Sequence, residues 1–465
     1  MNRATKKQRR TDAEALFFEG NGLMAAGDWD AAETCFRHAV QLVPDFAEAH
    51  GNLGLVLDHG GNMVQAEASY RQSLALAPGC SQVLLNLGAL LATQKRFEQA
   101  QAVYDEAILY HPGSPAAWSN LGALLAGMKR EEEAETCLRE AIRLDGAYAK
   151  AHFNLSYLLL RQGRFEEGWQ CLEARDWYTA LASHLACPRW QGESLAGKSL
   201  LIGYEAGHGD MIQFCRYAKV LKTQGASHIT LLCHPALRTL FMALDSVDVV
   251  MAYDEPIPKS RWDFWTPLMS LPYHCQTRAE SIPAEIPYLH ARANLVEKWH
   301  ARLPRGHLRV GLVWKGNPKF ENDADRSLAS LALLAPLGAV KRVCFMSLQK
   351  GVGEDEATRP PTGLPLAPLG SQMTDFADAA AIVASLDLVI CVDTAMAHLT
   401  AALGKPCWLL LPDYMTDWRW RSEGTDSLWY PGVMRLFRQP QAGDWSSVLA
   451  AVVTALEDFT CAKLD

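Results

Sequence analysis

A polar segment that follows an apolar run near the C-terminal end has the strongest chemical pattern in the chain. Residues 386–392 are apolar and partly β-branched, which predicts a buried parallel strand. Asp393 and Thr394 then open an Ala- and Leu-rich helix that contains His398 and stops at Gly404. The backbone N–H groups and the dipole of such a helix start favour a phosphate. We therefore expect a nucleotide diphosphate here, although a plain N-cap and a core histidine remain the alternative.

A second polar turn follows an earlier predicted strand at 198–204. Its glycines allow close backbone approach just past the strand end, and Asp210 opens the helix expected at 210–221. It lacks the third glycine of the dinucleotide fingerprint and the Gly-Lys-Ser/Thr of a Walker motif. Asp210 is either a helix cap or a functional carboxylate. The other residues expected in this loop are Gly207, His208, Gly209 and Gln213.

Polar and cationic side chains also follow two strands of the last third, predicted at 309–314 and 343–348. Cations at strand ends are suited to charge-assisted contacts with a diphosphate, although each one alone could be a solvated surface charge. Their recurrence at successive strand ends favours a shared anion site. The residues expected to contact the nucleotide are Lys315, Asn317, Arg326 and Gln349.

A metal site is not predicted. Asp323-Ala324-Asp325 matches the Asp-x-Asp pattern with which some sugar transferases hold a metal ion, but residues 28–30 match it too and lie in a repeat turn. We also expect no cofactor. Of the late tryptophans, most are expected to pack between the halves, and Trp418, Trp420 and Arg421 could border the acceptor side.

The composition describes a packed protein, with 49% hydrophobic and 21% charged residues. A net charge of −8 argues against a nucleic-acid partner held by phosphate contacts. The 12 cysteines show no Cys-x-x-Cys pair, which favours reduced thiols in the cytoplasm. No apolar run follows the basic N-terminus, and none approaches the roughly 18 residues of a membrane span, so we expect a soluble protein.

The first half of the chain repeats with a period of 34 residues. Four residue types recur at this spacing: proline, small residues, alanine and large apolar residues. Small residues let two helices cross closely, large apolar residues fill the space between them, and proline ends the second helix. Examples of the four types are Pro44, Pro78 and Pro112; Gly20, Gly54, Gly88 and Gly122; Ala32, Ala66, Ala100 and Ala134; and Phe36, Tyr70, Tyr104 and Leu138. The pattern resembles the tetratricopeptide repeat, in about five copies. Such solenoids usually hold an extended peptide or partner helix, and self-association or spacing is the alternative.

The second half changes to a βαβ succession, which predicts parallel sheets. The expected fold is therefore an α-solenoid followed by two Rossmann-like α/β domains whose strand ends face a common cleft. The expected boundaries are a basic disordered tail at 1–10, the solenoid at 11–176, a linker at 177–197, an acceptor domain at 198–300 and a nucleotide-sugar domain at 301–465.

The four motifs resemble those of bacterial heptosyltransferase-type sugar transferases, which have the two-domain GT-B fold. The segments that carry the resemblance are 207–213, 315–327, 347–351 and 393–399. The order of repeats followed by this transferase is similar to that of bacterial protein glycosyltransferases, including those that modify flagellin. In plan it also parallels the O-linked N-acetylglucosamine transferases, with less motif-level similarity.

The resemblance assigns expected roles to individual residues. Asp210 matches the aspartate taken as the base that activates the acceptor hydroxyl. Asp393, Thr394 and His398 match the motif that contacts the nucleotide-sugar. Arg326 stands where heptosyltransferases usually have a lysine on the phosphates. Ala395 replaces a common glycine, and both departures leave the identity of the sugar open.

The function implied is an inverting, metal-independent transfer of a sugar from a nucleotide-sugar to a protein, such as flagellin or another surface protein, recruited by the repeats. Two alternatives remain. The acceptor could be a lipid-linked or polysaccharide glycan, with the repeats only recruiting the enzyme. The chain could also be a non-catalytic scaffold with a degenerate transferase half.

Overall fold

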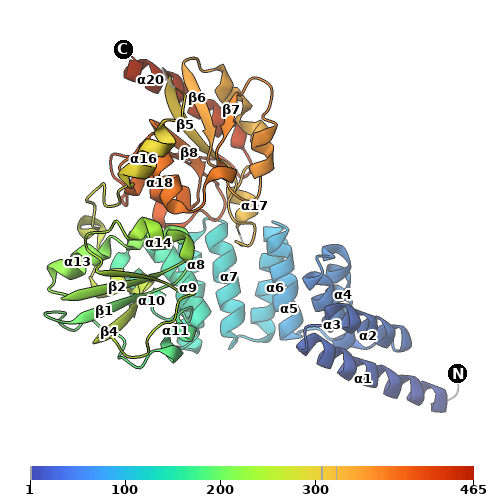
Figure 1. The fold of residues 1–465 in the computed structure, drawn as a ribbon. Coiled ribbons are helices and arrows are strands. Elements are labelled where there is room, and N and C mark those ends of the chain that lie inside the picture. Colours follow the sequence, from blue (N-terminus) through green and yellow to red (C-terminus); the bar gives the residue numbers. More distant parts are fainter. Residues whose placement is uncertain (1–2, 305–306, 321, 465) are drawn as a thin grey trace. The chain divides into compact units, whose positions relative to one another are not determined.

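The computed structural model describes residues 3–304, 307–320 and 322–464. Its ribbon is drawn in Figure 1. The chain forms two compact units, Met1–Leu155 and Ser156–Asp465, and each has its own core.

The first unit is built from antiparallel helix pairs. A Cβ atom placed on Gly20 would lie 2.8 Å from the Phe36 ring, and one on Gly122 would lie 2.7 Å from the Leu138 side chain. Small residues on one helix therefore admit the large residue of the next, which confirms the expected repeat contact. Its helices are α1 (Arg3–Ala25), α2 (Trp29–Leu42), α3 (Ala47–His59), α4 (Met63–Leu76), α5 (Ser81–Thr93), α6 (Phe97–Tyr110), α7 (Pro115–Gly127), α8 (Glu131–Leu144) and the start of α9 (Ala149–Arg161).

The first helix begins earlier than expected. Residues 1–2 of the expected disordered tail lie outside the described residues, but 3–10 belong to α1. Gln8 donates to Asp12 at 2.8 Å, and Arg10 pairs with Glu14 at 3.1 Å, so i, i+4 contacts extend the helix through the basic segment.

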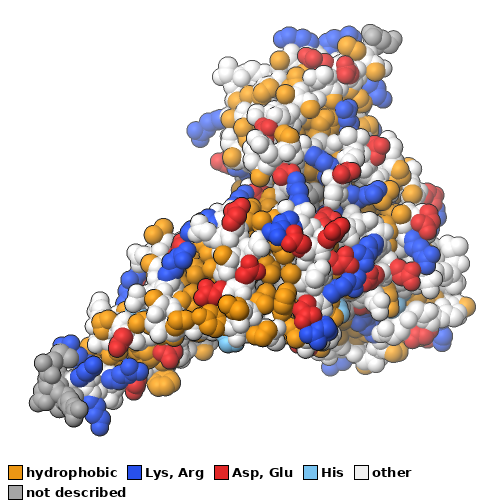
Figure 2. Space-filling view, turned by 180° about the vertical axis from the view of Figure 1, so that it is seen from behind, with side chains coloured by type: hydrophobic (Ala, Val, Ile, Leu, Met, Phe, Trp, Pro, Cys, Tyr) orange, Lys and Arg blue, Asp and Glu red, His pale blue; other side chains and the backbone are white. Residues whose placement is uncertain are grey.

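The surface charges of the repeats are mostly paired along the helices. Arg71 lies 2.9 Å from Glu67, and Arg139 lies 2.8 Å from Glu135, both one helical turn apart. Figure 2 shows acidic and basic side chains interspersed on the face that it presents. Each such exposed pair contributes little stability.

The fifth helix pair ends within the second unit. Its second helix, α10 (Phe165–Leu172), is followed by a short helix α11 (Thr179–His184) inside the segment expected to be a linker. The chain then runs beside the strand β4 (Phe264–Pro267), where the Trp190 N–H donates to the carbonyl of Trp265 at 2.8 Å. The segment 177–197 is thus packed along a sheet edge.

The first sheet is parallel, with the strand order β3-β2-β1-β4. The helix expected at 210–221 is divided in two near Cys215. The strands are β1 (Ser199–Gly203), β2 (His228–Cys233), β3 (Val249–Ala252) and β4, and the helices are α12 (His208–Phe214), α13 (Tyr217–Thr223), α14 (Pro235–Phe241) and α15 (Leu271–His274).

The second sheet is also parallel, with the order β10-β9-β8-β5-β6-β7. Its strands are β5 (Leu308–Val313), β6 (Val343–Ser347), β7 (Leu366–Pro368), β8 (Leu388–Val392), β9 (Cys407–Leu411) and β10 (Met434–Arg438). Its helices are α16 (Ala293–His300), α17 (Asp323–Arg326), α18 (Phe376–Ala384), α19 (Ala395–Ala402) and α20 (Trp445–Leu464). Short 3₁₀ segments occur at Leu268–Ser270, Ala279–Ser281, Leu331–Ala339, Glu354–Thr358, Gly370–Gln372 and Trp418–Trp420.

Helix α16 precedes the expected domain boundary at 300/301 but packs against the second sheet's helix α18. Trp299 is fully buried and donates its indole N–H to Asp378 at 2.7 Å. The chain therefore crosses to the second sheet before residue 300.

Helix α20 is long and apolar enough, by length and composition, to cross a membrane. Its inner face, however, belongs to the core of the second sheet, where Val448, Val452 and Leu456 are buried beside strand residues. This face of α20 is therefore part of the core.

Candidate functional site

The two turns singled out in the sequence face each other within the second unit. Helix α12 packs against α19, and Gly209 lies in this contact. A Cβ atom on Gly209 would lie 2.8 Å from Cδ2 of His398 and 3.5 Å from Cα of Ala395. A larger residue would push the two turns apart, so glycine is required here by the packing. The turn that carries Asp210 and the turn that carries Thr394 therefore pack against each other.

Thr394 is the N-cap of α19, but its side chain makes no capping hydrogen bond. Its Oγ1 is buried and has no hydrogen-bond partner among the described residues. The first N–H groups of a helix need acceptors from outside the helix, and a buried hydroxyl without a partner is costly. Helix starts of this kind are places where proteins commonly bind anions.

Asp393 closes strand β8 beside Thr394. Burial, and to a lesser extent the neighbouring Asp417 carboxylate, raise the pKa of its carboxyl to about 6, although the Arg326 and Arg419 charges oppose the shift. The Trp420 indole N–H donates to this carboxyl at 2.8 Å. Near neutral pH Asp393 can therefore accept a hydrogen bond or, when protonated, donate one.

His398 lies inside the interface between the two turns. It is 5% exposed, its Nδ1 lies 2.8 Å from the Tyr430 hydroxyl, and its ring stacks on Trp420. Burial, with the Arg419 and Arg216 charges, holds the pKa of this imidazole well below its usual value. His398 is thus a neutral, packed ring, as in the core-histidine alternative.

Asp210 occupies the third position of α12, and Gly207 is the N-cap. Its Oδ2 accepts the Gly207 N–H at 2.8 Å. The carboxylate therefore satisfies the backbone N–H of the N-cap residue, as in a capping box. Its Oδ1 pairs with the guanidinium of Arg419. The capping and functional interpretations of Asp210 are therefore compatible, since the same contacts fix the carboxylate in place.

Arg419 is the main residue that the sequence analysis missed. Its side chain is 6% exposed, and its guanidinium donates to Gln213, Asp210 and Asp417. It is held over the Trp418 ring at 4.3 Å. The available signal was a cation inside the Asp-Trp-Arg-Trp segment after β9, where the expectation favoured the exposed Arg421 instead.

The expected phosphate-binding cations are paired with carboxylates of their own domain. Lys315 Nζ lies 2.5 Å from Glu356, and Arg326 Nε lies 3.0 Å from Asp323. Neither is therefore the solvated surface charge of the alternative interpretation. The Asp-x-Asp motif also has an explanation, because Asp323 accepts from both Arg326 and Ser327. Within the described residues, no group of three His, Cys, Asp or Glu side chains could hold a metal ion.

Gln349 organises the turn after β5. Its Oε1 accepts the N–H groups of Trp314 and Lys315, both at 3.0 Å, and its Nε2 donates to the carbonyl of Val352 at 2.8 Å. Its amide is thus committed to backbone contacts that hold Lys315. Asn317 accepts the Lys319 N–H at 3.1 Å at the surface and stabilises the same turn.

The remaining loop residues lie on the first-sheet side. His208 packs against His234 and Phe376, and burial together with the His234 charge lowers the pKa of its imidazole to about 4. Gln213 is fully buried and accepts from Arg419. The loop thus presents neutral rings and one carboxylate.

Comparison with known families divides the chain in the same way. Tetratricopeptide-repeat models match residues 19–81 and 130–182, and a second such model matches 59–125 and 91–143. The model of glycosyltransferase family 9 (heptosyltransferase) matches residues 339–409. The latter range contains Asp393, Thr394 and His398, whereas Asp210 and Arg419 lie outside it.

Protein FlbA of Caulobacter vibrioides is 29% identical over 293 residues, which cover 58% of this chain and 48% of FlbA. The chain thus spans about half the length of that curated relative. Solved structures similar to parts of the chain include pilF of Pseudomonas aeruginosa, at 23% identity with a TM-score of 0.36, covering 47% of this chain and 90% of pilF. They also include YrrB, described as a repeat protein with an unusual peptide-binding site, at 18% identity with a TM-score of 0.31, covering 36% of this chain and 87% of YrrB. The chain joins a tetratricopeptide-repeat region to a glycosyltransferase family 9 (heptosyltransferase) domain.

Proposed function

We propose that this chain is an inverting, metal-independent glycosyltransferase that moves a sugar from a nucleotide-sugar to a protein hydroxyl. The observation that carries the proposal is the start of α19, which has no side-chain cap and a buried Thr394 hydroxyl without a partner among the described residues, packed against the helix of Asp210. The family 9 match over 339–409 supports the same activity.

In the proposed reaction the acceptor oxygen bonds to the anomeric carbon as the bond from that carbon to the diphosphate oxygen breaks. The acceptor proton passes to the Asp210 carboxylate, and the nucleoside diphosphate leaves as an anion. The first N–H groups of α19 and the nearby Arg419 would stabilise the charge that develops on the leaving group. Lys315 and Arg326 would also bind the diphosphate, either in place of Glu356 and Asp323 or together with them.

A recurring asparagine supports a protein acceptor. Partly exposed asparagines lie at the same position of successive first helices, 34 residues apart, and their amides can both donate to and accept from an extended peptide backbone. One of them, Asn154, donates to Ser119 of the preceding first helix at 3.4 Å. These asparagines are Asn52, Asn86, Asn120 and Asn154.

We place the enzyme in a reducing compartment, the cytoplasm. All twelve cysteines are free thiols, and most are buried. Even the neighbouring pair Cys391 and Cys407, with sulfur atoms 3.8 Å apart, is not joined.

The test of catalysis is Asp210→Asn in the full chain. Transfer should fall by about 10²–10⁴-fold, the usual contribution of a general base, while donor binding measured by calorimetry stays within twofold. Asp444→Asn is the matched control, because Asp444 also accepts backbone N–H bonds at a helix start but lies at α20. Undiminished transfer by the Asp210 variant would remove the proposed base, and failure of any nucleotide-sugar to bind would favour the scaffold alternative.

The test of the acceptor is Asn120→Ala, with Glu98→Ala on an exposed helix surface as the control. The KM for a protein acceptor should rise severalfold with kcat unchanged. If transfer to a lipid-linked or free glycan proceeds and neither variant alters it, the glycan alternative is favoured.

A further inference from the structure

The segment that ends the repeats is built into the second unit. Trp169 of α10 donates its indole N–H to the carbonyl of Thr277 at 3.0 Å. Its ring centroid lies 5.2 Å from Trp418 and 6.5 Å from Phe214. Helix α10 therefore packs against the helix that carries Asp210 and against the loop that carries Arg419.

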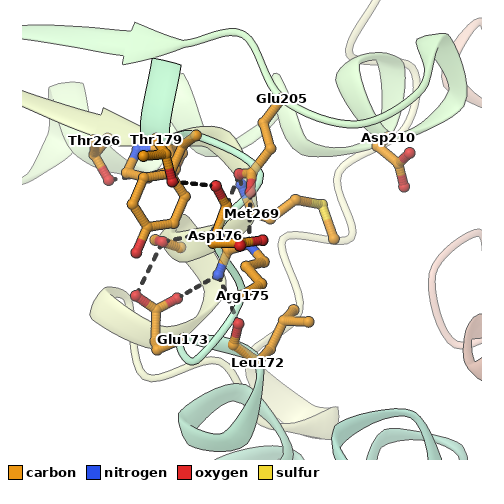
Figure 3. Close-up of polar contacts among 12 residues, drawn as sticks. Leu172, Glu173, Arg175, Asp176, Thr179, Glu205, Asp210, Thr266 and Met269 are labelled. Atoms are coloured by element: carbon orange, nitrogen blue, oxygen red, sulfur yellow. Dashed lines mark hydrogen bonds and ion pairs between the residues drawn. The ribbon is translucent and has the colours of Figure 1, made fainter. Parts of the chain in front are cut away.

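Three residues after α10, Arg175 enters a buried ion pair, which Figure 3 shows. Its Nε lies 2.6 Å and its Nη2 3.0 Å from the two carboxylate oxygens of Glu205. The side chains of Arg175 and Glu205 are 1% and 0% exposed. Glu205 also accepts the Met269 N–H at 3.0 Å, and Arg175 also donates to the carbonyl of Leu172 at 2.9 Å.

Stability alone is a poor reason for such a pair. Removing two charges from water costs several kcal/mol per ion, and apolar residues of similar size are often as stable or more stable. A bidentate pair with every contact satisfied does, however, fix the geometry of the backbone segments that it joins.

The segment fixed here is the turn that carries Asp210. Glu205 immediately precedes Ala206, whose φ of +61° places a residue with a side chain in the left-handed region. Such a conformation is strained for a residue with a side chain and persists only where its surroundings hold it. The next residue, Gly207, donates its N–H to Asp210. Arg175 is thus connected to the Asp210 carboxylate by the Arg175–Glu205 pair, the backbone of residues 205–207 and the Gly207–Asp210 hydrogen bond.

We propose that Glu205 and Arg175 are positioning residues for Asp210, through which the end of the repeat region sets the geometry of the catalytic turn. This inference rests on the proposed function of Asp210. It also means that a deletion of 11–176 would remove part of the transferase, because that range contains Trp169 and Arg175.

The first test is Glu205→Gln in the full chain, which keeps the acceptor for Met269 but breaks the charged pair. We expect kcat to fall at least about tenfold, with donor affinity within twofold of the wild type. Hydrogen–deuterium exchange of residues 204–214 should become faster. Asp263→Asn is the control. Asp263 accepts hydrogen bonds from Ser199 at the N-terminal end of strand β1, whereas Glu205 follows the C-terminal end of β1. The control variant should have lower thermal stability but unchanged kcat.

The second variant, Arg175→Met with Glu205→Gln, removes both charges and separates positioning from stability. Its melting temperature should return toward the wild-type value, whereas kcat should stay low and exchange in 204–214 fast. Recovery of kcat together with stability, or unchanged kcat in the single variant, would overturn the inference. If the wild type itself transfers no sugar, the proposed function fails, and the exchange of 204–214 alone decides whether the pair fixes the turn.

Discussion

The two turns of the candidate site differ in how completely their polar groups are satisfied. On the first-sheet side, both oxygens of Asp210 are engaged, and Glu205 behind it is bound by Arg175 and a backbone N–H. On the second-sheet side, Thr394 leaves its hydroxyl without a partner among the described residues and does not cap its helix. The polar groups of the first turn are thus satisfied within the protein, whereas the Thr394 hydroxyl of the second turn is not. This difference is what the proposed function requires, with Asp210 as the base and the start of α19 as the binding place of the diphosphate.

Arg419 links the Asp210 turn to the loop after β9, so its loss should have the largest effect. Arg419→Gln leaves the Asp210 and Asp417 carboxylates without their buried counter-charge. We expect a loss of about 3–5 kcal/mol in the free energy of unfolding, measured by urea denaturation, together with loss of transfer. Arg435→Gln, a control arginine on strand β10, should cost far less. Equal stabilities of the two variants would contradict the buried network.

Asp393 should make stability depend on pH. The folded-state pKa, about 6, lies above the usual value near 3.9, so its stabilising contribution is complete below pH 3.9 and is lost as pH rises through 6. The free energy of unfolding of Asp393→Asn should therefore exceed that of the wild type by up to about 2–3 kcal/mol at pH 7.5, and by less at pH 4.5. Urea melts at the two pH values measure this. A difference that does not change with pH would show that Asp393 is ionised throughout.

Thr394→Val tests whether the unpaired hydroxyl of the second turn contacts the donor. Because the Thr394 hydroxyl has no partner to lose, thermal stability should stay the same or rise slightly. Donor affinity, measured by calorimetry, should weaken by about tenfold if the hydroxyl contacts the diphosphate. Thr400→Val is the control, since that hydroxyl donates to the Met396 carbonyl within α19. Unchanged donor affinity in the Thr394 variant would move the anion away from this turn.

Ala206→Gly should have the smallest effect on stability. Glycine adopts the left-handed conformation without steric cost but loses more entropy on folding, so the net change should stay within about 1 kcal/mol. If Glu205 holds the turn, kcat should change less than twofold in this variant. A larger fall in kcat would mean that the alanine itself, and not the ion pair, fixes the turn.

The sequence predicted best what depends on local periodicity. The 34-residue spacing predicted the contacts between the recurring glycines and the aromatic rings of the repeats. Continuous apolar runs predicted the central strands β1 and β8. It missed the strands β4, β7 and β10, because these are short edge strands interrupted by Pro267, Pro368 or alternating arginines.

Ion-pair and hydrogen-bond partners that are distant in the sequence could not be predicted, because only tertiary packing brings them together. Arg419 lies 209 residues from Asp210, and Lys315 lies 41 residues from Glu356. No local pattern links either pair. The same limit explains α10, whose repeat pattern is regular although its Trp169 belongs to the transferase core.

The most direct test of the central claim is a crystal structure of the full chain with a bound nucleoside diphosphate. We expect its phosphate oxygens to lie within hydrogen-bond distance of the first N–H groups of α19 and of Thr394 Oγ1, on the side that faces Asp210. A diphosphate bound away from α19, or an α19 start that does not face Asp210, would contradict the account.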